Sequence, residues 1–425
     1  MNTNVRLNQD EEAMLEGARG PGAAMALRIV VEAARLLGAA RLVPVTSAHI
    51  DGCLYHGDSG VFFAERLLEL GARVAVPATL NVGALDLLHP ELVQGDDHHR
   101  TMSRRLMDAH LAFGCTPSWT CAPYQAGHRP GLGEQVAWGE SNAVAFVNSV
   151  LGARSNRYGD FLDLCCAITG RAPYCGLHVE ENRRASLVLD LSGLSTALRA
   201  SAAFYPVLGA LLGRLAGGEV AAILGVPPEI GEDALKALGA GAASKGAVGL
   251  FHVVGLTPEA PTLEAALQGE PPARSIEVTP DLLRAARDNL SSARGDGLGC
   301  IALGSPHFSY EECRELARLS KACLTGGRRF AVPVYVCTGR HVSERLAAEG
   351  LEAELESRGV TFVVDTCVVV TPIIKRVSGA LMTNSAKFAH YGRPNTGLET
   401  VYGSLADCVA SAEAGRVRRD ESIWQ

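Results

Sequence analysis

Hydrophobic and polar positions follow two different periods along the chain, and the two periods alternate many times. Apolar residues at helical spacing predict helices, and the short apolar runs between them predict strands. Glycine, proline and asparagine separate the segments. The predicted helices cover 9–15, 23–37, 61–70, 141–151, 197–215, 280–292, 310–323 and 342–357, and the predicted strands cover 42–46, 73–77, 220–224, 247–253, 299–303, 331–336 and 360–364. These repeated strand–helix–strand units predict an α/β fold built on parallel sheets.

The chain is long enough for more than one hydrophobic core. Its 425 residues exceed the usual size of one α/β domain, so two or three domains are expected. Turn formers cluster at 255–263 and 269–274, where we expect a crossing or a linker. The expected parts are an N-terminal α/β region (1–195) with the loop T-C-A-P-Y, a middle α/β domain (196–275), and a C-terminal α/β domain (276–425) with the loops G-S-P-H and D-T-C.

Composition and charge exclude several classes of protein. Hydrophobic residues make up 47% of the chain and charged residues 20%, which is typical of a globular protein. The net charge is −7 and no basic stripe occurs, so nucleic acid is not expected as a partner. No uninterrupted apolar run of about 18 residues predicts a membrane span, and the first residues lack the apolar core of a signal peptide. The 12 cysteines are therefore expected to be mostly free thiols in the cytoplasm.

Polar side chains stand directly after predicted strands, which is where open α/β sheets bind their ligands. Ser305 and His307 follow the strand at 299–303, and Cys367 follows the strand at 360–364. Neighbouring parallel strands end at the same edge of a sheet, so these three side chains are expected to lie close together. In the N-terminal region, Ser47 and His49 follow the strand at 42–46 in the same way, either as turn-capping residues or as contacts to a substrate.

Two further polar groups allow two interpretations each. Arginine binds carboxylates in bidentate fashion, but a salt-bridged surface also explains the dense set Arg154, Asn156, Arg157, His178, Glu181, Asn182 and Arg183. Lys387 and His390 stand in an apolar neighbourhood, where they either form the solvated face of a helix or contact a substrate carboxylate. The pair His98-His99 is interpreted as an exposed turn, and Cys165-Cys166 as the core of a helix.

Several common cofactor motifs are missing from the sequence. No G-x-G-x-x-G follows a strand, and neither a Walker A loop nor H-E-x-x-H nor C-x-x-C occurs. The sequence therefore gives no support for nicotinamide, nucleoside triphosphate or zinc-protease chemistry.

A set of strings along the chain resembles the large subunit of aconitase X, a branch of the aconitase superfamily. The matching strings are V-T-S-A-H-I-D-G (45–52), V-P-A-T-L-N (76–81), T-C-A-P-Y (120–124), the run W-G-E-S-N to R-S-N-R (138–157), G-L-H-V-E-E-N-R (176–183), F-H-V-V-G-L-T-P-E-A-P (251–261), G-S-P-H, D-T-C and S-A-K-F-A-H-Y. The resemblance implies an aconitase-like multidomain α/β/α fold, with parallel sheets around a central cleft. It also implies a hydro-lyase with a cysteine-bound iron centre, in which a large chain pairs with a separate small subunit that swivels.

The resemblance carries an iron site over to Cys121 and Cys367. Some members have G-C-P-H where this chain has G-S-P-H, so Ser305 takes the place of a third cysteine. Cys300 is an alternative ligand, but five strand residues put it about 16 Å from Ser305. Cys115 is the other alternative, if its loop folds back. The expected cofactor is therefore iron, as a [2Fe–2S] cluster or as a mononuclear ion.

The resemblance further implies a substrate and an assignment of roles. The expected reaction is dehydration of cis-3-hydroxy-L-proline to 1-pyrroline-2-carboxylate. The alternatives are dehydration of 5-phosphomevalonate or another hydroxy acid, and a regulatory or RNA-binding homologue without catalysis. The catalytic candidates are Ser47, His49 and Lys387, and the substrate-binding candidates are Asn81, Arg157, His178, Arg183, His307 and His390.

Overall fold

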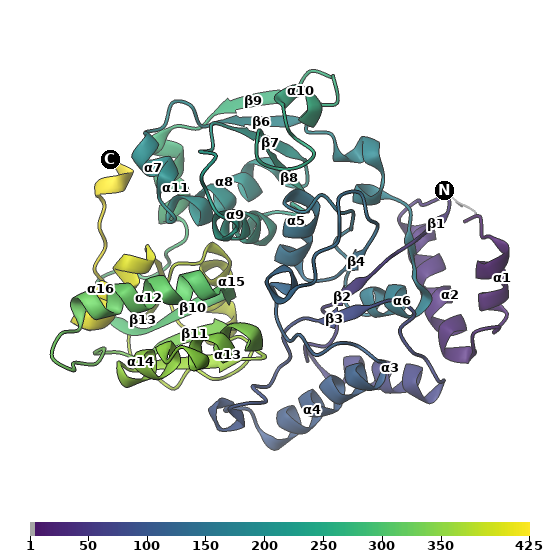
Figure 1. The fold of residues 1–425 in the computed structure, drawn as a ribbon, viewed down its shortest axis with the longest axis horizontal. Helices are drawn as coiled ribbons and strands as arrows, with labels where there is room; N and C mark the ends of the chain where they lie inside the picture. Colours follow the sequence, from purple (N-terminus) through teal and green to yellow (C-terminus); the bar gives the residue numbers. More distant parts are fainter. Residues whose placement is uncertain (1–4) are drawn as a thin grey trace. The chain divides into compact units, whose positions relative to one another are not determined.

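The computed structural model describes residues 5–425 and divides them into two compact units. Unit 1 comprises residues 5–85 and Gly95–Arg184, and unit 2 comprises Asp86–Gln94 and Ala185–Gln425. Both units are mixed α/β structures, as the alternating periods predict (Figure 1). Within residues 5–425, no helix has the length and apolar character needed to cross a membrane.

Unit 1 is built around a small parallel sheet with the strand order β3-β2-β4. A separate antiparallel pair joins β1 to β5. Helix α6 packs on β2 and β4 and also on α2. The helices are α1 (Gln9–Leu15), α2 (Pro21–Leu36), α3 (Asp58–Glu69), α4 (Asp97–Ala112), α5 (Ser141–Ser149), α6 (Leu162–Thr169), η2 (Pro123–Ala126), η3 (Gly176–His178) and η4 (Glu180–Arg183), and the strands are β1 (Leu42–Pro44), β2 (Ala48–Ile50), β3 (Ala78–Leu80), β4 (Ala137–Trp138) and β5 (Arg171–Pro173).

Unit 2 contains two parallel sheets, with the strand orders β8-β7-β6-β9 and β12-β11-β10-β13-β14. Its strands are β6 (Leu187–Asp190), β7 (Ala221–Leu224), β8 (Phe251–Val253), β9 (Arg274–Glu277), β10 (Leu298–Phe308), β11 (Val334–Thr338), β12 (Val360–Val364), β13 (Ala380–Thr383) and β14 (Thr400–Tyr402). Strand β6 belongs to the first of these sheets, so that sheet begins before residue 195, where the N-terminal region was expected to end.

Helices pack on the five-stranded sheet of unit 2. Helix α12 packs on β10 and on α13, α14 and α16, and α15 packs on β10, β13, β14 and α9 (Figure 1). The helices are η1 (Pro90–Leu92), α7 (Thr196–Ala200), α8 (Phe204–Ala216), α9 (Glu232–Lys245), α10 (Leu263–Ala266), α11 (Pro280–Asp288), α12 (Tyr310–Cys323), α13 (Arg340–Ala348), α14 (Leu351–Ser357), α15 (Ala386–Thr396), α16 (Leu405–Ala414) and η5 (Ser422–Trp424).

Several predicted elements are interrupted or displaced in the structure. The predicted helix 197–215 is two helices, and α8 carries Pro206 in its first turn, where proline is tolerated. The predicted helix 342–357 breaks at Gly350, which adopts a left-handed φ of 76°. Residues 73–77 form no strand, because their backbone groups bond to irregular partners and the paired segment begins at Ala78. The other predicted elements keep their order, and the structure adds further helices and strands between them.

Candidate functional site

One face of the β3-β2-β4 sheet carries a layer of polar side chains. His49 in β2 pairs in register with Thr79 in β3 and with Trp138 in β4, so the three side chains share a face. Side chains two residues further along a strand return to the same face. The row that follows contains Asp51, Asn81 and Glu140. The short strands therefore bring residues from three distant parts of the sequence to one edge.

Hydrogen bonds connect this second row. The Asn81 amide donates to Glu140 Oε2 at 3.0 Å and also to Asp51 Oδ1. Asn81 is fully buried, and its Oδ1 has no hydrogen-bond partner within residues 5–425. Burial raises the pKa of Asp51, and the neighbouring Glu140 and Asp160 raise it further. This row therefore combines a neutral amide with a carboxyl group whose pKa is raised.

Asp163, the second residue of α6, holds the turn after β2. Its Oδ2 accepts the backbone N–H of Asp51 at 2.6 Å and that of Gly52 at 3.1 Å. Burial nevertheless raises the pKa of Asp163 to about 7, against these hydrogen bonds. A buried carboxyl group near neutrality beside a polar row is a feature of sites that move protons.

The first row contains a chain of hydrogen bonds. Ser47 Oγ lies 2.9 Å from His128 Nε2, and His128 Nδ1 lies 2.7 Å from Thr79 Oγ1. Thr79 Oγ1 in turn lies 2.8 Å from His49 Nδ1. Burial lowers the pKa of His49 to about 3 and that of His128 to about 4, so both rings are neutral at pH 7.

Cys121 is buried in the loop before η2, in the same unit as the polar layer. The side-chain amide of Asn142 donates to the Cys121 carbonyl at 2.7 Å. Glu140 caps α5 by accepting the backbone N–H of Asn142 at 3.2 Å. The start of α5 therefore links the backbone of Cys121 to the second row.

The Cys367 thiol lies in an environment that favours its ionised form. A hydrogen bond from the Cys337 thiol lowers the pKa of Cys367 most, and burial opposes this shift. The backbone of Val369, the charge of Lys387 and the Ser305 hydroxyl group lower the pKa further. The backbone N–H of Val368 donates to Cys337 Sγ at 3.4 Å. This arrangement is typical of a reactive or metal-binding thiolate.

Ser305 and His307 join this cluster as the shared sheet edge predicts. His307 Nε2 lies 3.0 Å from the Thr366 carbonyl, and Ser385 donates to the Ser305 carbonyl. Burial lowers the pKa of His307 to about 4, and the charge of Lys387 contributes to the shift. The cluster therefore gathers residues from β10, from the loop after β12 and from the start of α15.

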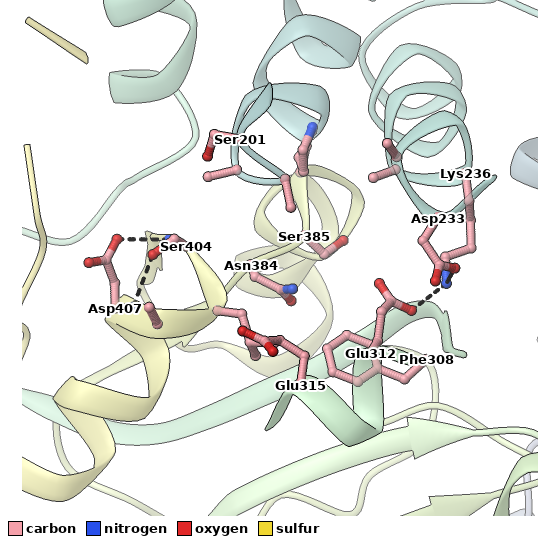
Figure 2. Close-up of a pocket in the computed structure, with 18 of the residues that line it drawn as sticks. Ser201, Asp233, Lys236, Phe308, Glu312, Glu315, Asn384, Ser385, Ser404 and Asp407 are labelled. Atoms are coloured by element: carbon pink, nitrogen blue, oxygen red, sulfur yellow. Dashed lines mark hydrogen bonds and ion pairs between the residues drawn. The ribbon is translucent and has the colours of Figure 1, made fainter. Parts of the chain in front are cut away.

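A cavity of about 570 Å³ adjoins this cluster in unit 2, and Ser305 and Ser385 belong to its wall. Figure 2 shows Asp233, Glu312 and Glu315 around it, together with Asn384. Among the lining residues that the structure describes, Lys236 is the one cation, and it pairs with Asp233 at 2.9 Å and with Glu312. The wall of the cavity therefore carries a net negative charge.

Two residues expected to bind substrate have other contacts. Arg183 is buried and donates to the carbonyls of Leu177, Asn148 and Ala153 and to the Asn148 side chain, at 2.9–3.2 Å. The ring of His178 is buried between Gln135 Oε1, at 2.5 Å, and the Tyr158 hydroxyl. These contacts hold the loops that follow α5 and β5.

The remaining candidates differ in their exposure and surroundings. Arg157 is exposed, and His390 stacks edge-on against Tyr391 with a pKa lowered by burial and by Lys245. Burial raises the thiol pKa of Cys115 and of Cys300 to about 12, so these thiols stay protonated at neutral pH.

The sequence analysis missed several members of the two clusters. Cys337 and Thr366 adjoin Cys367, and Thr79 and His128 connect Ser47 to His49. The position of Cys337 near the end of a predicted strand, one strand before Cys367, was a usable signal. His128 gave none, because it lies in a loop and reaches the sheet only through the fold.

Comparison with known proteins identifies the family. Sequence models of the first, second and third domains of aconitase X match residues 4–181, 185–288 and 298–414. The chain is 42% identical over 422 residues to the cis-3-hydroxy-L-proline dehydratase of Pseudomonas aeruginosa, covering 99% of this chain and 72% of that protein. The enzyme of the same name from Hypocrea jecorina is 40% identical over 413 residues, which cover 96% of this chain and 69% of that protein.

Two archaeal proteins are also similar. The chain is 36% identical over 402 residues to the phosphomevalonate dehydratase large subunit of Methanothermobacter thermautotrophicus, covering 94% of this chain and 96% of that subunit. The structure of Thermococcus kodakaraensis aconitase X in its holo form superposes with a TM-score of 0.84 at 31% identity, covering 96% of this chain and 100% of that one. Matches of this extent show that the chain belongs to the aconitase X family.

Proposed function

We propose that this chain is a hydro-lyase that dehydrates cis-3-hydroxy-L-proline to 1-pyrroline-2-carboxylate. The observation that carries the proposal is the 42% identity over 422 residues to a dehydratase of that substrate, against 36% over 402 residues to a phosphomevalonate dehydratase large subunit. Dehydration of another hydroxy acid, 5-phosphomevalonate included, is the alternative.

The cavity beside Ser305 supports the first substrate. Its wall carries several carboxylates and one lysine, which is already paired with two of them. 5-Phosphomevalonate would bring a phosphate and a carboxylate among these like charges, whereas hydroxyproline carries one carboxylate that its own ring ammonium offsets.

Iron is the cofactor that we propose for this site, as a [2Fe–2S] cluster or a mononuclear ion. Cys367 fits such a ligand, because its lowered pKa favours the thiolate that binds metals. Cys121 is proposed as the second ligand and Ser305 as the third. Cys115 and Cys300 fit less well, because their thiols have raised pKa values. Bound iron would supply Lewis acidity that assists the departure of hydroxide.

The side chains of the chain itself are proposed to bind the substrate and handle its protons. Asn81 has a buried Oδ1 with no hydrogen-bond partner among residues 5–425, and it can accept a hydrogen bond from a substrate. His49 and Ser47 are the proposed catalytic groups of unit 1. Lys387 is the proposed partner of the substrate carboxylate in unit 2, with His307 beside it. We do not assign substrate binding to Arg157, His178, Arg183 or His390.

A small-subunit partner is also proposed. The matched region spans 96% of an archaeal protein named as a large subunit and 72% of the Pseudomonas enzyme. A serine on the small subunit is our candidate for the base that removes the α-proton. The described cysteines are all free thiols, which is typical of the cytoplasm.

Anaerobic co-expression with a small-subunit partner tests these proposals. Iron and sulfide are measured in the purified protein, and both substrates are assayed by mass spectrometry of the product. Cys121→Ser and Cys367→Ser should each lose iron, whereas the matched control Cys300→Ser, in a strand of the same unit as Cys367, should keep it. Absence of iron together with absence of turnover on either substrate would overturn the proposal.

A further inference from the structure

His49 has one ring nitrogen with a partner and one without. Its side chain is fully buried, and Nδ1 is bonded to Thr79. Within residues 5–425, Nε2 has no hydrogen-bond partner. A buried polar atom is normally paired, and exceptions are common at functional sites. His49 Nε2 is therefore available to a bound ligand.

The chain of hydrogen bonds behind His49 restricts where its proton lies. Thr79 Oγ1 has one proton and bonds to two imidazole nitrogens, so it donates to one and accepts from the other. If Ser47 donates to His128 Nε2, the His128 proton is on Nδ1 and Thr79 accepts it. Thr79 then donates to His49 Nδ1, and the proton of neutral His49 must be on Nε2.

The surroundings of His49 favour this direction over its reverse. Glu140 is close enough to raise the pKa of His49, although burial lowers it by more. A negative charge nearby favours a proton, and not a lone pair, on the unpartnered nitrogen. Glu134 raises the pKa of His128 in the same way, so each of the two rings has a carboxylate of its own nearby.

We propose that Thr79 and His128 are positioning residues that hold His49 neutral with its proton on Nε2, aimed at a substrate oxygen. A neutral imidazole in this state donates a hydrogen bond without a net charge, and it needs no proton transfer to do so. The inference rests on the proposed function for the identity of the oxygen, either the substrate carboxylate or its hydroxyl group. The tautomer of His49 does not depend on that function.

The first experiment reads the tautomer directly. A ¹H–¹⁵N correlation spectrum of the chain labelled on its 12 histidines distinguishes protonated Nε2 from protonated Nδ1. The variant His49→Gln assigns the signals. We expect the His49 proton on Nε2 in the wild type and in Thr79→Ser, which keeps the hydroxyl group. Thr79→Val should give a mixture of tautomers. A proton on Nδ1 in the wild type, or a Thr79→Val spectrum equal to the wild type, would overturn the proposal.

The second experiment measures turnover of cis-3-hydroxy-L-proline by the co-expressed enzyme. Thr79→Val should lower kcat by roughly 10- to 100-fold with little change in KM, because a misplaced donor costs rate. Thr79→Ser should restore most of the rate. Thr46→Val is the matched control, since it removes an exposed hydroxyl group that bonds to Glu134 and Gln135. A changed tautomer with unchanged kcat would overturn the role in catalysis. Absence of turnover in the wild type would count against the proposed function, and the spectra would still decide the tautomer.

Discussion

Replacing Arg183 distinguishes between two roles of its guanidinium group, namely holding the fold and binding a substrate carboxylate. The side chain is 1% exposed and donates four hydrogen bonds, three of them to backbone carbonyls. Arg183→Met leaves the three carbonyls without this donor, whereas Asn148 Oδ1 still accepts the backbone N–H of Ser155. At about 1 kcal/mol for each of the four lost hydrogen bonds, the free energy of unfolding should fall by about 4 kcal/mol. For a unit of this size, that loss lowers the melting temperature by about 8–16 °C.

The assay follows unit 1 by itself, since two compact units need not unfold together. Of the 3 tryptophans, Trp119 and Trp138 belong to unit 1 and Trp424 belongs to unit 2. The tryptophan fluorescence of the protein therefore reports mainly on the unit that holds Arg183. The activity of the folded variant is measured well below its transition, with Arg154→Met as a control whose partner Glu180 is largely exposed.

The result that refutes this reasoning is specific. A guanidinium that clamps a substrate carboxylate would raise KM roughly 10- to 100-fold when removed, because bonds between charged groups contribute more than neutral ones. We expect kcat/KM to stay within about twofold of the wild type. An unchanged melting temperature together with a raised KM would show that Arg183 binds substrate.

Three further outcomes follow from the structure. Burial lowers the pKa of His110 from 6.5 to about 4. As the pH falls, the unfolded chain therefore binds a proton at His110 before the folded chain does, and the free energy of unfolding decreases between about pH 6.5 and pH 4. In denaturant titrations, the free energy of unfolding of His110→Leu should fall by about 2 kcal/mol less than that of the wild type between pH 7 and pH 5. Lys236→Met leaves its two carboxylate partners without a counter-ion, although each keeps a hydrogen bond from Ser309, and this should cost about 3 kcal/mol and lower the urea midpoint of unit 2. Gly304→Ala places a Cβ 2.0 Å from the Cys337 carbonyl at a φ of 88°, so calorimetry should show a loss of about 2 kcal/mol or more, whereas the exposed Gly326→Ala meets no atom within 4 Å.

The cluster around Cys367 was predictable because it follows from sheet topology alone. A polar residue directly after a parallel strand lies at the carboxyl edge, and residues after neighbouring strands are neighbours in space. That rule placed Ser305, His307 and Cys367 together, and β10, β11 and β12 are adjacent strands in the structure. Strand β10 runs to Phe308, so Ser305 and His307 lie within the strand, in the irregular stretch between the paired residues Leu303 and Phe308.

The polar network of unit 1 was only partly predictable. The strands there are two or three residues long, too short to show a hydrophobic period. His128 reaches Thr79 from a loop 49 residues away, a contact that depends on tertiary structure. The sequence could not assign a role to Arg183 for the same reason. A guanidinium that bonds to buried carbonyls and one that binds a substrate carboxylate have the same sequence signal until the surrounding carbonyls are known.

The polar layer of unit 1 is difficult to explain by stability alone. Ser47, His49 and Asp51 follow each other at intervals of two residues, so a strand places all three on one face of the sheet. Apolar side chains on that face would stabilise the unit by burial and would leave no nitrogen or oxygen unpaired. The chain instead buries His49 Nε2 and the Asn81 oxygen with no partner among residues 5–425, and it holds two carboxyl groups with raised pKa values. Groups that cost stability and point at no protein partner are best explained by a ligand that pairs with them, so this face is where substrate contacts should be sought first.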